Sequence, residues 1–209
     1  IKVLTPESSA ERVQEICKSL PITHIPIVEN GKLLGCISES DSQIIEDDTS
    51  VISRYSHLID LFFANENTTI LKLIKLFADN ESNIMPVLNN KKQYVGYYEL
   101  HDILDLVCSS PFVSTEGIII VVEKNNKDFS VSEASQIVEI NDGKVLGIYI
   151  SSEVSEKKQA IIKISSEDIN EIIQTFRRYN YTVISEHEDD FYLQDLKERS
   201  DYLQKYLNM

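Results

Sequence analysis

Residues 22–41, ITHIPIVENGKLLGCISESD, decide the fold because the chain contains a second copy of them. The copy occupies residues 83–102 and reads NIMPVLNNKKQYVGYYELHD. Pro26 corresponds to Pro86, and the glycine and the final aspartate of each copy also align. A repeat of this length indicates two copies of one supersecondary unit, and it determines how the chain packs.

Each copy is predicted to form a helix, two strands and a second helix. Ser8 and Glu11 have the spacing of a capping box that begins the first helix. Thr68 or Thr69 begins the equivalent helix of the second copy. Because one such unit cannot bury both faces of its strands, we expect the two copies to pack together by pairing their small sheets.

Residues 42–64 connect the two copies. The segment contains an acidic patch, and then Leu58, Leu61 and Phe62 follow one another at helical spacing. The pattern predicts an apolar helix in this connection.

The composition is that of a soluble globular protein, with 42% apolar and 26% charged residues among 209. The longest apolar run, residues 118–122, is too short to span a bilayer. A net charge of −14 without a basic stripe argues against nucleic-acid and membrane-surface binding. Three cysteines without CxxC spacing indicate free thiols, and hence a cytoplasmic protein. The chain opens at Ile1 without a methionine, which leaves room for an upstream segment.

Sequence motifs of catalysis and of metal binding are absent. The chain has no Gly-rich phosphate loop, no HExxH and no nucleophile elbow, and its cysteines lack zinc-site spacing. We therefore expect no catalytic residues, no metal ligands and no obligatory cofactor.

The repeated pattern, an apolar residue, Pro, apolar residues, a hairpin, Gly and then Ser/Thr-x-x-Asp, resembles a tandem pair of CBS domains, the Bateman module. The resemblance covers residues 1–109, with repeats at about 1–48 and 60–108. It implies two clefts between the repeats that bind adenosine-type ligands such as AMP, ADP, ATP or S-adenosylmethionine.

The resemblance also implies the ligand-binding residues. Asp41 and Asp102 would accept hydrogen bonds from ribose hydroxyls, and the Ser38 hydroxyl would meet a phosphate. Backbone groups would bracket the adenine, and one lead-in residue would line the same cleft; these residues are Ile22, Thr23, His24, Ile25, Asn83, Ile84, Met85 and Thr5.

Other interpretations of these residues remain open. Asp41 and Asp102 are also favourable simply as acids in the first turn of a helix, and Ser38 as a helix cap. Glu99 stands where the pattern has Ser or Thr, and its carboxylate would repel a phosphate. One cleft is therefore expected to be empty or to take a ligand without a phosphate there.

After a break at residues 109–111, the chain has a different pattern. Its predicted order of elements is β-α-β-β-α-β, with helices capped by Ser130 and by Ser165 or Ser166 and a last strand at residues 181–185. Residues 114–188 thus resemble an ACT domain, which has a ferredoxin-like fold and commonly binds amino acids. The loop at residues 125–129 lacks the Pro and Gly of ACT ligand sites, so a dimerisation or packing role is favoured.

Residues 190–209 are predicted to form an amphipathic C-terminal helix with Leu193, Leu196, Leu203, Tyr206 and Leu207 on or near one face. Three roles remain open for it: it covers a sheet, pairs with its twin in a dimer, or docks a partner.

The sequence thus predicts an α+β protein, a tandem CBS pair followed by an ACT-like domain and a C-terminal helix. It is similar to regulatory proteins of the acetoin-utilisation type. We expect a non-catalytic cytoplasmic homodimer that senses an adenosine-type ligand and acts on an unidentified protein partner. The alternative is a ligand-free adaptor homodimer that recruits a partner enzyme.

Overall fold

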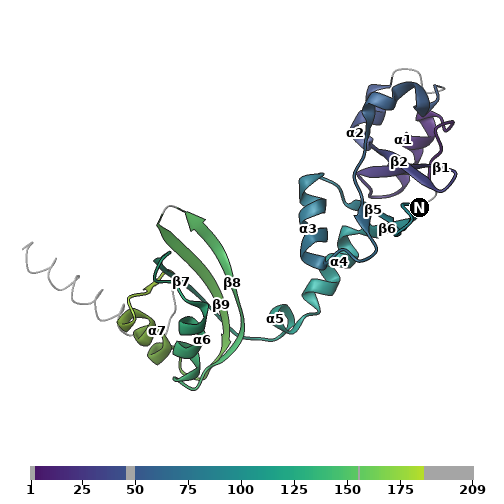
Figure 1. Ribbon diagram of the computed structural model, residues 1–209. Coiled ribbons are helices and arrows are strands. Elements are labelled where there is room, and N and C mark those ends of the chain that lie inside the picture. The colour runs from purple at the N-terminus through teal and green to yellow at the C-terminus, as the bar shows by residue number, and fades with distance from the viewer. Residues whose placement is uncertain (1–2, 46–49, 155, 186–209) are drawn as a thin grey trace, which may run out of the picture. The chain divides into compact units, whose positions relative to one another are not determined.

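The computed structural model describes residues 3–45, 50–154 and 156–185. The chain divides into two compact units, residues 1–109 and 110–209. Figure 1 shows the helices and strands of both units with their labels.

The first unit begins with the elements of the first sequence copy. They are α1 (Ala10–Ser19), β1 (His24–Glu29), β2 (Lys32–Ser38) and α2 (Glu39–Ile44), followed by the 3-10 helix η1 (Ile52–Leu58) and β3 (Ile59–Asp60). The strands form a sheet in the order β1-β2-β3.

The second sequence copy builds the rest of this unit on the same plan. Its elements are β4 (Ala64–Asn65), α3 (Ile70–Asp79), β5 (Ile84–Leu88), β6 (Tyr94–Glu99) and α4 (Leu100–Cys108). These strands form a second sheet, in the order β4-β5-β6. The predicted helix-strand-strand-helix units are confirmed in both copies.

The two copies agree down to single hydrogen bonds. The Thr5 N–H donates to the Ser8 hydroxyl at 3.0 Å. At the equivalent place in the second copy, the Asn65 N–H donates to the Thr68 hydroxyl, also at 3.0 Å. Both hairpins also carry a register shift at the same position, after Ile27 in one copy and Val87 in the other. The sequence repeat is therefore a structural repeat.

The residue that begins α1 differs from the prediction by one position. Ser9, not Ser8, is the N-cap, and its side chain accepts from the Arg12 N–H. The Ser8 hydroxyl is already used by Thr5 in the preceding turn. Ser8 and Ser9 both fit the sequence pattern of a helix cap. The hydrogen bond from the Thr5 N–H occupies the Ser8 hydroxyl and leaves Ser9 as the cap.

The predicted apolar helix around Leu58, Leu61 and Phe62 is wrong. Ile59 and Asp60 instead form β3, which pairs antiparallel with β2. Leu61 is 63% exposed, whereas Phe62 is buried in the core of the second copy. Residues 59–60 can be extended because β2 provides hydrogen-bond partners for their backbone groups. The spacing of apolar residues within the segment does not reveal this distant partner.

Thr23 and Asn83, which occupy equivalent positions in the two copies, bind each other. The Thr23 N–H donates to Asn83 Oδ1 at 2.8 Å, and the Asn83 N–H donates to Thr23 Oγ1 at 3.0 Å. Asn83 Nδ2 also donates to the Pro21 carbonyl at 2.6 Å. These reciprocal bonds join the copies where β1 and β5 begin.

The cores of the two copies are shared across this junction. Ile84 of β5 packs in the apolar cluster around α1 and β1. Cys36 of β2 packs in the cluster around α3 and β5. Each copy therefore supplies a buried side chain to the other, and the pair is expected to fold as one unit.

The second unit contains one four-stranded antiparallel sheet. Its elements are α5 (Pro111–Ser114), β7 (Ile118–Asn125), α6 (Val131–Glu139), β8 (Lys144–Val154), β9 (Lys157–Ser165), α7 (Ile169–Arg178) and β10 (Thr182–Val183). The strand order is β10-β7-β9-β8. The predicted β-α-β-β-α-β order of elements is confirmed.

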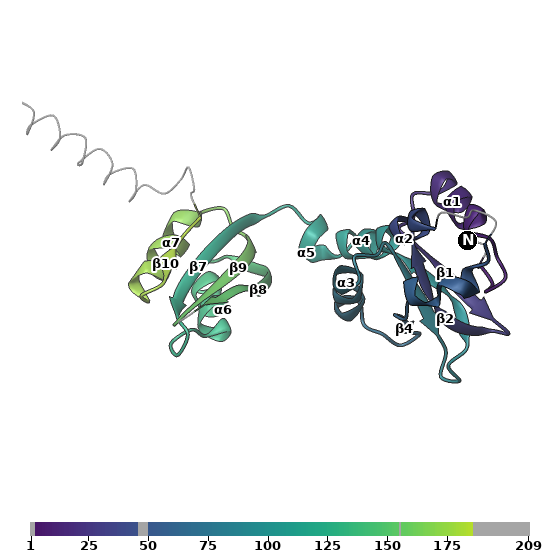
Figure 2. The ribbon, with the colours of Figure 1, turned by 90° about the horizontal axis from the view of Figure 1, so that it is seen from above.

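Both long helices of the second unit pack on the same face of its sheet (Figure 2). The inward side chains of β7 and β9 and those of the helices form one buried cluster, with Ile120, Ile162, Ile137, Ile173 and Phe176 among its members. The opposite face of the sheet lies outside this cluster.

Two details of the second unit differ from the prediction. Asp168, not Ser165 or Ser166, is the N-cap of α7, and its carboxylate accepts from the Asn170 N–H at 2.8 Å. Residue 165 instead ends β9, which runs further than its apolar residues indicate. The last strand is also shorter than predicted, while the Ser130 cap of α6 is confirmed.

The predicted helix at residues 190–209 lies outside the described residues. Among the helices of residues 3–45, 50–154 and 156–185, none is both long enough and apolar enough to cross a membrane.

Gly35 and Gly96, equivalent glycines, provide a matched pair for a stability test. Both have a positive φ, +151° and +155°. A Cβ on Gly35 would lie 2.5 Å from Ile59 Cγ2 and 2.8 Å from the Asp60 carbonyl oxygen, whereas a Cβ on Gly96 would meet nothing within 4 Å. Close packing therefore requires a glycine at the first position only.

We expect Gly35→Ala to lower the free energy of unfolding by about 1–3 kcal/mol more than Gly96→Ala, because it alone adds an overpacking clash to the backbone strain that both share. Urea unfolding followed by circular dichroism measures the difference. Equal losses in the two variants would contradict the contact with β3.

Candidate functional site

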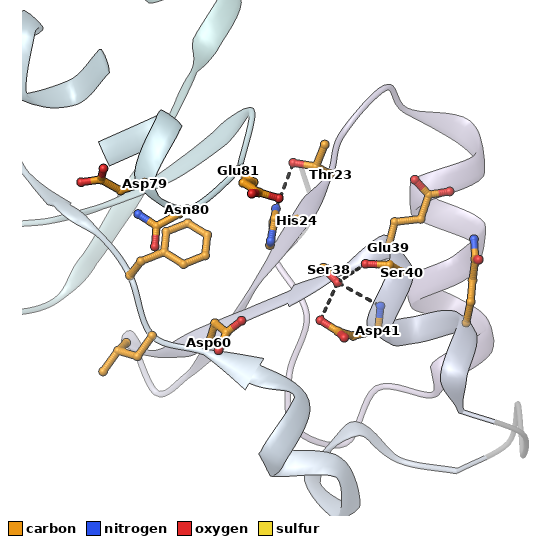
Figure 3. Close-up of a pocket in the computed structure, with 13 residues that line it drawn as sticks. Thr23, His24, Ser38, Glu39, Ser40, Asp41, Asp60, Asp79, Asn80 and Glu81 are labelled. Carbon is orange, nitrogen blue, oxygen red and sulfur yellow. Dashed lines mark hydrogen bonds between the residues drawn. The ribbon is translucent and has the colours of Figure 1, made fainter. Parts of the chain in front are cut away.

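A cleft of about 800 Å³ lies in the first unit, between the start of α2 and the end of α3. The residues that line it come from both copies; they are Thr23, His24, Ser38, Glu39, Ser40, Asp41, Gln43, Asp60, Leu61, Phe62, Asp79, Asn80 and Glu81. In Figure 3, Ser38 and Asp41 lie on one wall, and Asp79, Asn80 and Glu81 lie on the other.

Ser38 and Asp41 are linked at the beginning of α2. The Ser38 hydroxyl donates to Asp41 Oδ2 at 2.6 Å and accepts from the Asp41 N–H at 2.9 Å. Ser38 is therefore the helix cap, as one interpretation of the sequence had it. The same bonds hold the Asp41 carboxylate in one orientation, with the second oxygen outside this pair.

His24 lies on the floor of the cleft, where β1 begins. Its ring packs edge to face against Phe62, with centroids 5.4 Å apart. Burial lowers the pKa of His24 below its usual 6.5, although the carboxylates of Asp41 and Asp60 act in the opposite direction. The imidazole is therefore neutral at physiological pH.

The hydrogen bonds of Thr23 indicate which ring nitrogen of His24 carries the proton. The Thr23 hydroxyl donates to Asn83 Oδ1 at 3.1 Å, so it accepts from His24 Nδ1, which lies 2.9 Å away. His24 Nε2 is then an acceptor, available to a donor group of a ligand.

The first cleft is strongly acidic. Of the described residues that line it, none is Lys or Arg, and five carry carboxylates: Glu39, Asp41, Asp60, Asp79 and Glu81. Asp79 is paired with Lys75 of α3, whose Nζ lies 2.8 Å from its carboxylate. The other four carboxylates have no Lys or Arg beside them among the residues that line the cleft, and His24 is neutral. The cleft therefore attracts cations and repels free anions.

A second cleft, of about 550 Å³, occupies the equivalent place on the other side of the junction. Its lining residues are Leu20, Pro21, Ile22, Asn83, Ile84, Tyr97, Glu99, Leu100, His101 and Leu104. Glu99 replaces Ser38 here, and it accepts a hydrogen bond from Tyr97. Burial, followed by the Glu99 charge and this bond, raises the pKa of Tyr97.

The residues predicted from the sequence are distributed between the two clefts. The first cleft contains Ser38, Asp41, Thr23 and His24. The second contains Ile22, Asn83 and Ile84. Four further residues, Thr5, Ile25, Met85 and Asp102, line neither of these two clefts.

The side chains of Ile25 and Met85 are fully buried in the two cores of the first unit. Thr5 is hydrogen-bonded to Ser8 in the turn before α1. Asp102 lies in the first turn of α4, where an acid is favourable without any ligand.

The residues that each copy contributes to the other's cleft were not predicted from the sequence. The end of α3 supplies Asp79, Asn80 and Glu81 to the first cleft. The end of α1 supplies Leu20 and Pro21 to the second. The ends of α1 and α3 occupy equivalent positions in the sequence repeat, so their similar roles could have been predicted. Only the packing shows that each helix end lies in the cleft of the other copy.

Within the described part of the chain, no cluster of three or more His, Cys, Asp or Glu side chains is arranged to hold a metal ion. The carboxylates of the first cleft therefore act on a ligand through their electrostatic field and do not form a coordination shell for a metal ion.

Comparison with protein families identifies the first unit. Residues 1–41 and 52–109 match the family model of the CBS domain. The two matched segments coincide with the two sequence copies, and the structure shows the copies packed as a pair. The first unit of this chain is a CBS domain pair, as the resemblance implied.

Among curated proteins, inosine-5′-monophosphate dehydrogenase from Streptococcus pyogenes is 27% identical over 103 residues. The match covers 48% of this chain and 21% of the enzyme. The chain therefore spans about a fifth of the length of this relative, and the enzyme's activity is not transferred to it.

Solved structures with a similar fold include a CBS domain pair/ACT domain protein from Thermotoga maritima, with 17% identity, a TM-score of 0.46 and coverage of 51% of this chain and 88% of that chain. The cytosolic domain of the Mg²⁺ channel MgtE in complex with ATP has 20% identity, a TM-score of 0.41 and coverage of 50% and 44%. CBSX2 in complex with AMP has 14% identity, a TM-score of 0.44 and coverage of 51% and 87%. All three TM-scores lie below 0.5.

The environment of His24 predicts its titration. We expect the His24 resonances to titrate below pH 6.5 in NMR spectra of the folded protein, because burial disfavours the imidazolium. Asp41→Asn and Asp60→Asn each remove a carboxylate that raises this pKa, and each should lower it further. Asp105→Asn is the matched control, because Asp105 pairs with His101 on α4.

The sign of the linked stability change follows from the same shift. The unfolded chain binds a proton at His24 more readily than the folded protein does, so this residue's contribution to stability is present above pH 6.5 and is lost as the pH falls below it. A His24 pKa above 6.5 would contradict both expectations.

Proposed function

We propose that this protein is a non-catalytic regulator whose CBS pair senses an adenosine-type ligand in the first cleft. The observation that carries the proposal is the linked Ser38–Asp41 pair on the wall of that cleft. An oriented carboxylate with one oxygen outside the pair is suited to accept a ribose hydroxyl. The bound state then biases the second unit or a partner protein.

Further groups in the first cleft suit the rest of such a ligand. His24 Nε2 is a neutral acceptor, able to accept from an exocyclic amino group. Phe62 presents an aromatic ring beside it. An adenine base packed against His24 and Phe62 would contact an apolar surface and donate one hydrogen bond to His24 Nε2.

The charge of the first cleft favours one class of adenosine ligand. A phosphate brought to 4 Å from a carboxylate is repelled by about 4 kcal/mol at the effective dielectric constant of a protein surface. Five carboxylates line this cleft. The cleft is therefore suited to an adenosine compound that carries positive charge, S-adenosylmethionine above all, or to a nucleotide that brings Mg²⁺ with it.

The second cleft has a different role in this proposal. Glu99 occupies the position of Ser38, and its carboxylate is held by Tyr97 at the cleft wall. We infer that this cleft takes no phosphate, and that Asp102, which does not line it, contributes little to binding.

We propose the following division of the chain: CBS repeats at about 1–48 and 60–108, an ACT-like ferredoxin-fold domain at 114–188, and a C-terminal helix at 190–209. The order of elements and of strands in the second unit supports the ACT-like assignment. A cytoplasmic homodimer remains part of the proposal.

The first loop of the second unit supports a packing role over amino-acid binding. Three of its backbone N–H groups are already used: Asn126 donates to the Glu156 carbonyl at 2.7 Å, and Asp128 and Phe129 donate to the Asn125 carbonyl at 3.0 and 2.9 Å. A ligand carboxylate would have to compete for these donors.

A second candidate function is that of an adaptor, a homodimer that recruits a partner enzyme and whose clefts bind nothing. Glu99 and the carboxylates of the first cleft favour it, because both oppose phosphate-bearing ligands.

Calorimetric titration and thermal unfolding with S-adenosylmethionine, and with AMP, ADP and ATP with and without Mg²⁺, test the proposal. We expect S-adenosylmethionine to bind, Mg²⁺ to strengthen ATP binding, and free nucleotides to bind most weakly. A ligand at a hundredfold excess over its dissociation constant adds about 2.7 kcal/mol of stability.

Asp41→Ala should abolish the binding while leaving the protein folded, and Asp102→Ala is the matched control on the equivalent helix. Equal losses in both variants would contradict the assignment to the first cleft. Failure of all four compounds to bind would leave the adaptor as the function.

A further inference from the structure

Asn83 of the second repeat has a single amide orientation, which two groups of the first repeat decide. The Thr23 N–H can only donate, so the amide atom that lies 2.8 Å from it is the oxygen. The Pro21 carbonyl can only accept, so the amide atom that lies 2.6 Å from it is the nitrogen. A flipped amide would place a donor against a donor and an acceptor against an acceptor. Asn83 therefore presents its oxygen to Thr23.

The Thr23 hydroxyl connects this amide to His24. Its oxygen accepts from the Asn83 N–H at 3.0 Å, and it donates its proton to Asn83 Oδ1 at 3.1 Å. His24 Nδ1 lies 2.9 Å from the same hydroxyl oxygen and must then be the donor of the bond that joins them. If the hydroxyl proton turned to Nδ1 instead, Asn83 Oδ1 would lose one of the two bonds that it accepts from Thr23. The neutral ring therefore carries its proton on Nδ1 and a lone pair on Nε2.

His24 Nε2 faces the first cleft. Only 9% of His24 is exposed, and the end of its ring that lies away from Thr23 points into the space between the two cleft walls (Figure 3). Within the described part of the chain, the hydrogen bond of the His24 side chain is the one that Nδ1 makes with Thr23. Nε2 is therefore a free acceptor whose partner must come from the cleft.

A fixed acceptor in this place distinguishes two classes of purine. Adenine carries an amino group at C6, which donates, whereas hypoxanthine and guanine carry a carbonyl oxygen there, which only accepts. A lone pair on Nε2 pairs with the amino group and repels the carbonyl oxygen, and a proton on Nε2 would do the reverse. The tautomer of His24 therefore decides which class of purine the first cleft prefers.

We propose that Asn83, acting through Thr23, holds His24 in the Nδ1–H tautomer, and that the first cleft thereby selects a 6-amino purine over a 6-oxo purine. The selection rests on the proposed function, whereas the tautomer is a property of the free protein. Asn83 is a positioning residue, because it lines the second cleft and acts on the first through two successive hydrogen bonds. These three residues form a relay that runs from one cleft to the other.

The tautomer is measured on the full chain without any ligand. Long-range ¹H–¹⁵N correlation spectra distinguish protonated from unprotonated ring nitrogens at about pH 8, where His24 is neutral because burial lowers its pKa below 6.5. His24→Gln assigns the signals, and we expect Nδ1 to be the protonated nitrogen. His101 is the internal reference with the opposite form, because its Nε2 lies 3.5 Å from the Asp105 carboxylate, which only accepts.

Substitutions along the relay test which residue sets the tautomer. Asn83→Ala removes the acceptor of the Thr23 hydroxyl proton, so we expect His24 to shift toward the Nε2–H form. Thr23→Ser keeps the hydroxyl and should keep the Nδ1–H form. Asn80→Ala is the matched control and should leave the tautomer unchanged, because this asparagine lines the same cleft but donates to the Leu76 carbonyl of α3 at 2.7 Å.

Circular dichroism establishes that each variant is folded. Thr23→Val, which removes the hydroxyl itself, replaces Asn83→Ala if that variant does not fold, and it should also shift His24 toward the Nε2–H form.

Calorimetric titration with adenosine and inosine measures the selection. These nucleosides share a sugar, carry no phosphate and differ in the amino or oxo group at C6. We expect the wild type to bind adenosine about tenfold more tightly than inosine, the ratio that the loss of one hydrogen bond gives. Asn83→Ala should reduce this ratio severalfold, and Thr23→Ser should retain it. Asp41→Ala should abolish the adenosine binding, which assigns it to the first cleft.

Three results would overturn the proposal in distinguishable ways. A wild-type His24 protonated on Nε2, or a tautomer that Asn83→Ala and Thr23→Val leave unchanged, would overturn the relay. Inosine bound as tightly as adenosine by a protein in the Nδ1–H form would overturn the selection alone. Binding of neither nucleoside nor of S-adenosylmethionine, with the expected tautomer, would overturn the proposed function and the selection with it.

Discussion

Thr23 and Asn83 bind each other where the two CBS repeats meet, and the positions of both clefts depend on this contact. Thr23 immediately precedes β1 and Asn83 immediately precedes β5, so the bonds fix where these two strands start relative to one another. The ends of α1 and α3 then lie beside the opposite repeat's cleft. The shared packing of Ile84 and Cys36 supports the same arrangement from within the cores.

The two clefts occupy equivalent places in the two repeats but differ in polarity and charge. The first is polar and carries five carboxylates, whereas the second is lined mainly by apolar side chains with Glu99 at its wall. A symmetric pair would bind two similar ligands. Here the two clefts differ in charge and so favour different ligands. An adenosine-type ligand that binds the first cleft would therefore occupy only one of the two clefts.

Much of the fold was predictable because its signals are local. Helix caps such as Ser38 and Ser130 and the alternation of the strands follow from neighbouring residues. The failures fell where a distant partner decides the conformation. Leu58, Leu61 and Phe62 have helical spacing, yet β2 draws Ile59 and Asp60 into a strand. In the site, Ser38 and Asp41 could be predicted from one segment, whereas Asp79, Asn80 and Glu81 could not.

The sequence by itself determined the repeat, the order of elements in each unit and the candidate pair Ser38 and Asp41, because each depends on residues close together in the chain. Tertiary structure alone decided which residues face each other. It brought the end of α3 to the first cleft and so gathered carboxylates that lie far apart in sequence. It also aligned Val121, Ile161 and Tyr149 across three neighbouring strands, since strand register is set by pairing and not by any single strand.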